Sequence, residues 1–133
     1  MQPLCKFLII DDNEIDRMVT SLLIQRNIGA TEMILLNSGA DGIEWLKQNK
    51  TSIQERIIVL LDIKMPLMDG FEFLDELDEF DESVKKSIHI FLLSSTLDPS
   101  DINRAGSHKY VKTLLSKPLI TEELSALIDG ISV

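Results

Sequence analysis

The sequence has little of several features that mark other protein classes. Its 133 residues include one cysteine, so an internal disulfide is impossible, as is typical of proteins in the reducing cytoplasm. Its 13 basic residues are outnumbered by 22 acidic ones, and the net charge of −9 disfavours direct binding to nucleic acid or anionic lipid. The apolar stretch before Asp11 is too short for a signal peptide or a membrane span. We therefore expect a cytoplasmic protein without a nucleic-acid or membrane partner.

Familiar catalytic motifs and chain dividers are absent too. The sequence contains no P-loop, no G-x-G-x-x-G and no nucleophile elbow. No internal repeat, low-complexity run or linker rich in proline, glycine or serine divides the chain. Hydrophobic residues make up 44% and charged residues 26%, an ordinary globular composition. A chain of this length buries one core, so we expect a single domain over residues 1–133.

Short apolar runs alternate with amphipathic segments along the chain. The apolar runs predict strands at residues 5–10, 31–36, 56–61, 88–93 and 110–115. Apolar residues at helical spacing predict helices at residues 12–27, 40–48, 71–80 and 98–105, and a last one capped by Thr121. Strands alternating with helices imply right-handed βαβ units and a parallel sheet. The predicted fold class is α/β, with five strands and five helices.

Polar groups directly follow four of these strands. They are Asp11 and Asp12 after the first strand, Asp62 after the third, Ser94, Ser95 and Thr96 after the fourth, and Ser116 and Lys117 after the fifth. Sites in open parallel sheets form at the carboxyl ends of the strands, so we expect these groups to meet. Converging carboxylates repel one another, and Mg²⁺ with oxygen ligands relieves that repulsion. The set suits phosphoryl transfer onto Asp62, with Ser94 and Lys117 assisting.

Each of these residues taken alone has a purely structural explanation. Asp11 or Asp12 is suited to cap the first helix, and Asp62 is suited to a turn before Met65. A lysine at a strand end, such as Lys117, is commonly solvated. The order of acids, acid, hydroxyl and lysine, each after a separate strand, favours a functional site over these explanations.

Four segments resemble the receiver domain of bacterial two-component response regulators. They are IIDDN at residues 9–13, LDIKMPLMDG at 61–70, LSS at 93–95 and SKP at 116–118. The resemblance covers essentially the whole chain. It implies a flavodoxin-like, doubly wound sheet of strand order 2-1-3-4-5. It also implies a response regulator that accepts a phosphoryl group in a phosphorelay.

The resemblance assigns roles to individual residues. Asp62 would accept the phosphoryl group from a phosphohistidine. Mg²⁺ would be bound by Asp12, Asp62 and the backbone carbonyl of Lys64, with Asp11 acting mostly through a metal-bound water. The phosphoryl oxygens would be contacted by Ser94, Lys117 and the backbone N–H of Ser95, and the Lys64 side chain is a further candidate. We expect Gly70 to adopt a backbone conformation that other residues resist.

The resemblance also implies partners and a switch. The donor would be a sensor histidine kinase or a histidine phosphotransfer protein, and a target would dock on the fourth helix, fifth strand and fifth helix, roughly residues 99–131. In the family, the hydroxyl residue, here Ser94, moves toward the phosphoryl group and an aromatic residue three before the lysine turns inward. Leu114 occupies that position here. Tyr110 lies seven before Lys117, in a longer segment than the family has, so the switch residues are Ser94 with Leu114 or Tyr110.

Three alternatives remain open at this level. The chain is either a stand-alone receiver or a piece of a larger regulator. A pseudo-receiver that binds proteins without being phosphorylated is the second hypothesis, although the complete set of acids, hydroxyl and lysine argues against it. The third is an aspartyl-phosphate hydrolase, which the D-x-D-x-T motif would mark; Lys64 stands where that motif has its second acid. We therefore expect self-phosphorylation and autodephosphorylation, without enzymatic turnover.

Overall fold

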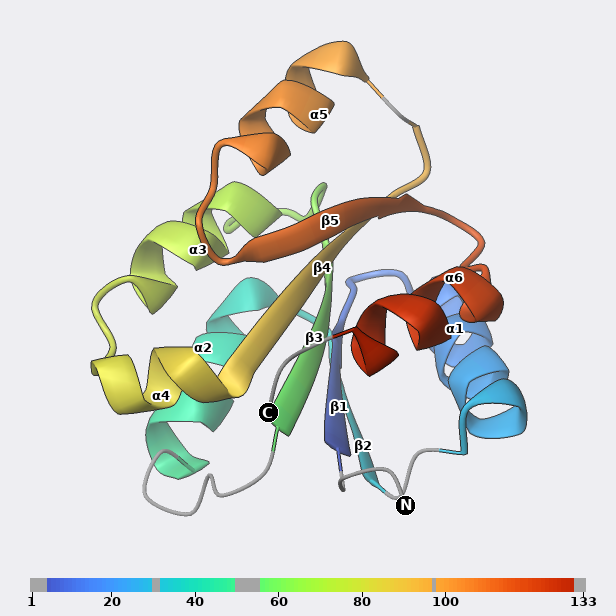
Figure 1. Ribbon diagram of the computed structural model, residues 1–133. Helices are drawn as coiled ribbons and strands as arrows, with labels where there is room; N and C mark the ends of the chain where they lie inside the picture. Colours follow the sequence, from blue (N-terminus) through green and yellow to red (C-terminus); the bar gives the residue numbers. More distant parts are fainter. Residues whose placement is uncertain (1–4, 30–31, 50–55, 97, 131–133) are drawn as a thin grey trace.

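The protein folds around a central parallel sheet. The computed structural model describes residues 5–29, 32–49, 56–96 and 98–130. The strands are β1 (Cys5–Ile10), β2 (Glu32–Leu36), β3 (Arg56–Asp62), β4 (Ile88–Ser94) and β5 (Val111–Ser116). All pairs are parallel, in the order β2-β1-β3-β4-β5 (Figure 1). The predicted α/β fold and its strand order are confirmed.

The described part of the chain also contains six helices. They are α1 (Glu14–Asn27), α2 (Gly39–Asn49), α3 (Gly70–Leu77), α4 (Glu82–Ser87), α5 (Pro99–Gly106) and α6 (Thr121–Asp129). The prediction of five helices is wrong because it omitted α4. This helix has six residues and only Val84 is buried, so it carries no amphipathic period. Thr121 is likewise the first residue of α6 rather than its cap, which is Ile120.

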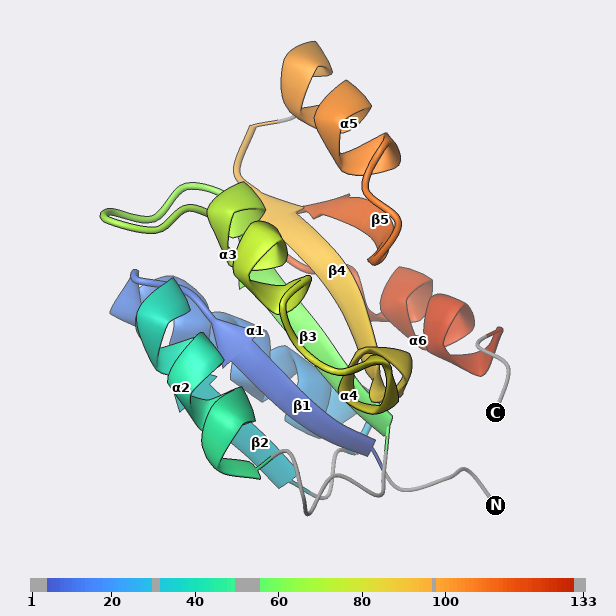
Figure 2. The same ribbon diagram turned by 90° about the vertical axis from the view of Figure 1, so that its left-hand side faces the viewer.

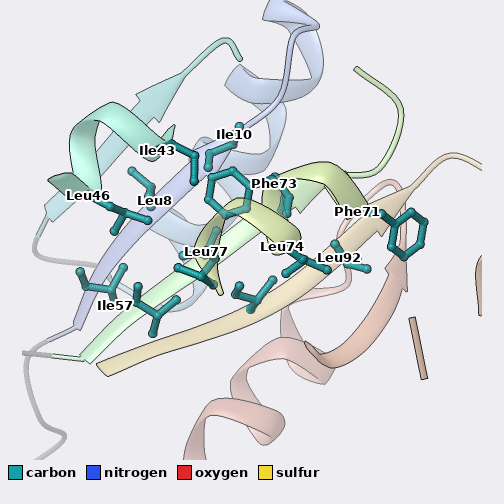
Figure 3. Close-up of a cluster of buried hydrophobic side chains, with 14 of the residues drawn as sticks. Leu8, Ile10, Ile43, Leu46, Ile57, Phe71, Phe73, Leu74, Leu77 and Leu92 are labelled. Carbon is teal, nitrogen blue, oxygen red and sulfur yellow. The ribbon is translucent and has the colours of Figure 1, made fainter. Parts of the chain in front are cut away.

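The helices cover both faces of the sheet. In Figures 1 and 2, α2, α3 and α4 lie on one face, and α1 and α6 lie on the other. Side chains alternate along each strand, so Leu8 and Ile10 join the core beneath α2 and α3, whereas Phe7 and Ile9 join the core beneath α1 and α6. Figure 3 shows the first core. Burial on both faces explains the continuous apolar runs Ile57–Leu61 in β3 and Ile90–Leu93 in β4.

The topology brings the carboxyl ends of β1, β3, β4 and β5 to one edge of the sheet. Residues Asp11, Asp62, Ser94 and Ser116 stand at or directly after these ends. In the described residues, no helix is both long enough and apolar enough to cross a membrane.

Candidate functional site

Three carboxylates converge at this edge. Asp11 follows β1 and is 1% exposed, and Asp62 is the last residue of β3 and is 6% exposed. Asp12 is exposed beside them. Carboxylate oxygens of all three lie within 4.8 Å of one another. The apolar strands that end here hold two of these acids rigidly, and the acids form a compact set of oxygen ligands.

The start of α1 fixes the position of Asp11. The backbone N–H of Asn13 donates to Oδ1 of Asp11 at 3.0 Å, and Nη1 of Arg17 donates to the Asp11 carbonyl at 2.7 Å. The cap of α1 is Asn13, whose side chain accepts from the N–H of Asp16 at 3.0 Å. Neither Asp11 nor Asp12 is therefore needed as a helix cap, and the structural explanation for these two acids is wrong.

Lys117 lies among the acids. Its Nζ is 2.8 Å from Oδ2 of Asp11, 3.0 Å from Oδ2 of Asp16 and 3.5 Å from Oδ2 of Asp62. Its backbone N–H donates to the Ser94 carbonyl at 2.9 Å, which ties the residue after β5 to the end of β4. The lysine side chain is only 12% exposed. It is thus an ordered cation of the site and not a solvated one.

The charges in the site shift two pKa values. Burial is the largest influence on the pKa of Asp62 and raises it, and the negative charges of Asp11 and Asp12 raise it further. The Lys117 ammonium and a hydrogen bond from the Lys64 backbone lower it. The net result is a pKa of about 6. Burial lowers the pKa of Lys117, but hydrogen bonds to Asp11 and Asp16 together with the negative charges of Asp62 and Asp11 outweigh burial, and the pKa is raised. At neutral pH Asp62 is therefore ionised, beside a protonated lysine.

The hydroxyl and loop residues border the acids. Ser94 is 2% exposed; its hydroxyl donates to the Thr96 carbonyl and accepts from the Thr96 N–H at 3.2 Å. Ser95 follows it and is exposed. Lys64 is exposed, with its backbone hydrogen-bonded to Asp62. Its charge also acts on Asp98, whose pKa is lowered first by Ser100 and further by Lys64. In this state Ser94 is engaged with its own loop.

The loop between β3 and α3 depends on a close backbone approach. A Cβ on Gly70 would lie 3.0 Å from both the Asp62 carbonyl oxygen and the Ile63 Cα. Gly70 does not adopt a positive φ, so the prediction of a special backbone conformation is wrong. Glycine is needed here because a side chain would collide with the backbone of Asp62 and Ile63. Asp69 caps α3, with a capping box closed by Glu72. Leu67, at the tip of the loop, has a φ of 69° and is fully exposed.

The two candidate switch residues lie at different ends of β5. Leu114 pairs with Leu92 and packs, half-buried, against the core beneath α3. Tyr110 precedes β5, at the end remote from Lys117. Its hydroxyl donates to Oδ1 of Asp78 at 2.6 Å, and the ammonium groups of Lys85 and Lys109 lie 5.4 and 5.0 Å from its ring centroid. The structure therefore does not bring Tyr110 to the acids.

Sequence reasoning missed Asp16 and Arg17, which contact Lys117 and Asp11 directly. A signal for Asp16 was present, because it lies four residues after Asp12, one helical turn further along α1. The contact of Arg17 with a backbone carbonyl leaves no comparable pattern in the sequence.

Comparison with known proteins identifies the family of this chain. The sequence profile of the response regulator receiver domain matches residues 7–129. This chain belongs to the response regulator receiver family. A two-component response regulator of rice (Oryza sativa subsp. japonica) is 32% identical over 119 residues, which cover 84% of this receiver and 51% of the rice protein. The receiver thus spans about half the length of that relative.

Solved structures agree with this assignment. The receiver resembles a response regulator receiver protein from Dyadobacter fermentans with a TM-score of 0.86 and 30% identity, covering 94% of this chain and 95% of that one. It also resembles the complex of CheX and CheY with BeF3 and Mg²⁺ from Borrelia burgdorferi, with a TM-score of 0.73 and 25% identity, covering 96% and 89%. The second structure contains Mg²⁺ and BeF3 together with its two proteins.

The residues of this receiver fit a magnesium ion. Asp11, Asp12 and Asp62 offer hard oxygen ligands at mutual distances that one small cation bridges. The raised pKa of Asp62 reflects burial and negative charge that such a cation would offset. The Lys64 carbonyl stays a predicted ligand.

Proposed function

We propose that this receiver accepts a phosphoryl group on Asp62 from a phosphohistidine of a sensor histidine kinase or a histidine phosphotransfer protein. The observation that carries the proposal is the placement of one ionised, buried carboxylate, Asp62, 3.5 Å from the Lys117 ammonium and beside two further acids. A carboxylate held in this way is a preorganised nucleophile, and its pKa of about 6 leaves it ionised at neutral pH.

In the proposed reaction, an Asp62 oxygen attacks phosphorus and an O–P bond forms. The N–P bond of the phosphohistidine breaks, and its electron pair returns to the imidazole nitrogen. Mg²⁺, when held by Asp11, Asp12 and Asp62, supplies positive charge for the phosphoryl oxygens. Lys117 supplies a second positive charge, and Ser94 supplies a hydroxyl after it leaves the Thr96 carbonyl. The Ser95 N–H and the Lys64 side chain are further proposed contacts.

The output of this proposed switch is a change in surface near α5. Ser94 is hydrogen-bonded to Thr96 in the loop leading to α5, so recruitment of its hydroxyl by a phosphoryl group would release that loop. A groove of about 340 Å³ lies between α5 and β5, lined by Ile102, Ala105, Val111 and Leu114 among others. We propose that a downstream protein docks on the face formed by α5, β5 and α6. We further propose that the receiver acts in the cytoplasm and does not turn over a small substrate.

Intact-mass spectrometry tests the acceptor. The protein is incubated with acetyl phosphate and Mg²⁺, beside Asp62→Asn and an EDTA-treated sample. We expect one phosphate-sized gain in the wild type and none in Asp62→Asn or in EDTA. Absence of any gain in a folded wild-type protein would sink the proposal and favour a pseudo-receiver that binds proteins without phosphate. A gain that persists in Asp62→Asn would move the acceptor to another residue.

A further inference from the structure

Asp16 makes a contact that the roles above do not require. It is the third residue of α1, its carboxylate lies 3.0 Å from Nζ of Lys117, and its side chain is 41% exposed. The three acids that could hold a metal ion are Asp11, Asp12 and Asp62, and Asp16 does not belong to that set. Asp16 therefore acts on the site through Lys117.

The ammonium of Lys117 is shared unequally among its acids. The contacts with Asp11 and Asp16, at 2.8 and 3.0 Å, lie within the range of charge-assisted hydrogen bonds, whereas the 3.5 Å separation from Asp62 lies beyond it. The two short contacts hold the ammonium toward β1 and α1. A phosphoryl group at Asp62 would compete with these two contacts for the ammonium.

We propose that Asp16 is a positioning residue that restrains Lys117 and thereby weakens the hold of the site on a phosphoryl group or its anionic mimic. The inference rests on the proposed function of Asp62. Two effects have the same sign: the Asp16 carboxylate attracts the ammonium that the anion needs, and its own negative charge disfavours an anion nearby. With Asp11 engaged by a cation, Asp16 is the carboxylate that remains to hold Lys117.

The first test compares the affinity for beryllium fluoride at saturating Mg²⁺, by isothermal titration calorimetry. Asp16→Asn removes the charge and keeps the shape of the side chain. We expect it to bind the mimic about two- to fivefold tighter than the wild type, the range that a partly exposed ion pair gives. Asp16→Glu retains the charge and should stay near the wild type. Circular dichroism melts establish that each variant is folded.

Glu14→Gln is the matched control. Glu14 is an exposed acid in the same turn of α1, so its removal changes the net charge equally. An affinity gain in Asp16→Asn that exceeds the gain in Glu14→Gln supports the proposal; equal gains, or weaker binding by Asp16→Asn, overturn it. The affinity for Mg²⁺ alone should change no more in Asp16→Asn than in Glu14→Gln, because Asp16 lies outside the metal set.

The same titrations separate this inference from the proposed function. Failure of the wild type to bind beryllium fluoride, in a protein that binds Mg²⁺, contradicts the proposed acceptor role itself. Binding by the wild type, with no difference between Asp16→Asn and Glu14→Gln, leaves that role intact and removes only the role of Asp16.

Discussion

At the scale of single residues, Asp62 is held as a charge in an environment that disfavours charge. Its burial and its acidic neighbours oppose ionisation, and Lys117 and the Lys64 backbone offset them only in part. The position of Asp62 among the acids at the sheet edge was predictable, because an aspartate directly after the apolar run Ile57–Leu61 is conspicuous in the sequence. The state of its neighbours was not predictable: no sequence pattern indicates that the Ser94 hydroxyl is engaged with Thr96.

Replacing Asp62 with asparagine should therefore stabilise the fold without divalent cations. The pKa of Asp62 is raised to about 6 from 3.8, so the folded state disfavours the ionised form and the cost is present above pH 6. A shift of this size corresponds to at most about 3 kcal/mol, and we expect a gain of about 1–3 kcal/mol at pH 7.5 in EDTA. Urea unfolding at pH 7.5 and 4.5 measures it.

The gain from Asp62→Asn should shrink as the pH falls from 6 toward 4, because the wild-type carboxyl then takes up its proton. Added Mg²⁺ should stabilise the wild type more than the variant. Glu14→Gln, which removes an exposed charge, should show neither effect. Equal stability of the wild type and Asp62→Asn at pH 7.5 would mean that the cluster of acids is not repulsive.

At the scale of elements, prediction worked where a segment carries a long, uniform pattern. Strands β3 and β4 are buried on both faces, so each contains a continuous run of apolar residues that is easily recognised in the sequence. The short helix α4 was not predicted, because a single buried residue produces no helical periodicity in the sequence. Gly70 was singled out for the wrong reason, because backbone proximity between two segments is a tertiary property.

The loop between β3 and α3 offers a test of local strain. Leu67 has a φ of 69°, a region that costs a residue with a Cβ about 1–2 kcal/mol, and its fully exposed side chain gains nothing from burial. Asparagine tolerates this conformation better, so Leu67→Asn should raise the free energy of unfolding by about 0.5–1 kcal/mol. Chemical denaturation compares it with Leu67→Ala, which retains the Cβ. A similar gain in Leu67→Ala would assign the effect to loss of exposed apolar surface instead.

At the scale of the whole molecule, we expect two groups, Asp62 and His89, to change the stability in opposite directions as the pH falls from 7.5 to 5. His89 is buried in β4, and its Nδ1 has no hydrogen-bond partner among the described residues. Burial lowers its pKa, and the charges of Lys112 and Arg56 lower it further. The unfolded chain thus takes up a proton near pH 6.5 that the folded chain resists, so His89 removes stability as the pH falls below 6.5.

His89→Leu should therefore lose less stability than the wild type between pH 7.5 and pH 5. Asp62→Asn should lose more, because the stabilising protonation of Asp62 is gone while His89 remains. Urea midpoints across this range, in EDTA, measure both slopes. Parallel slopes for the three proteins would show that neither group titrates differently in the folded and unfolded states.

The pairing of β5 with β4 contains a register shift, which bears on where the chain can tolerate inserted or deleted residues. Ile90 pairs with Val111, but Phe91 pairs with Thr113, so Lys112 is an extra residue in β5. Beyond this bulge the pairs run in step to Ser94 and Ser116, and Lys117 reaches the Ser94 carbonyl. We therefore expect an insertion or deletion at the amino end of β5 to be accommodated at the bulge, with Lys117 kept in place beside the acids. On this reasoning, the connection from α5 to β5 could differ in length between related chains while the residue after β5 keeps its position.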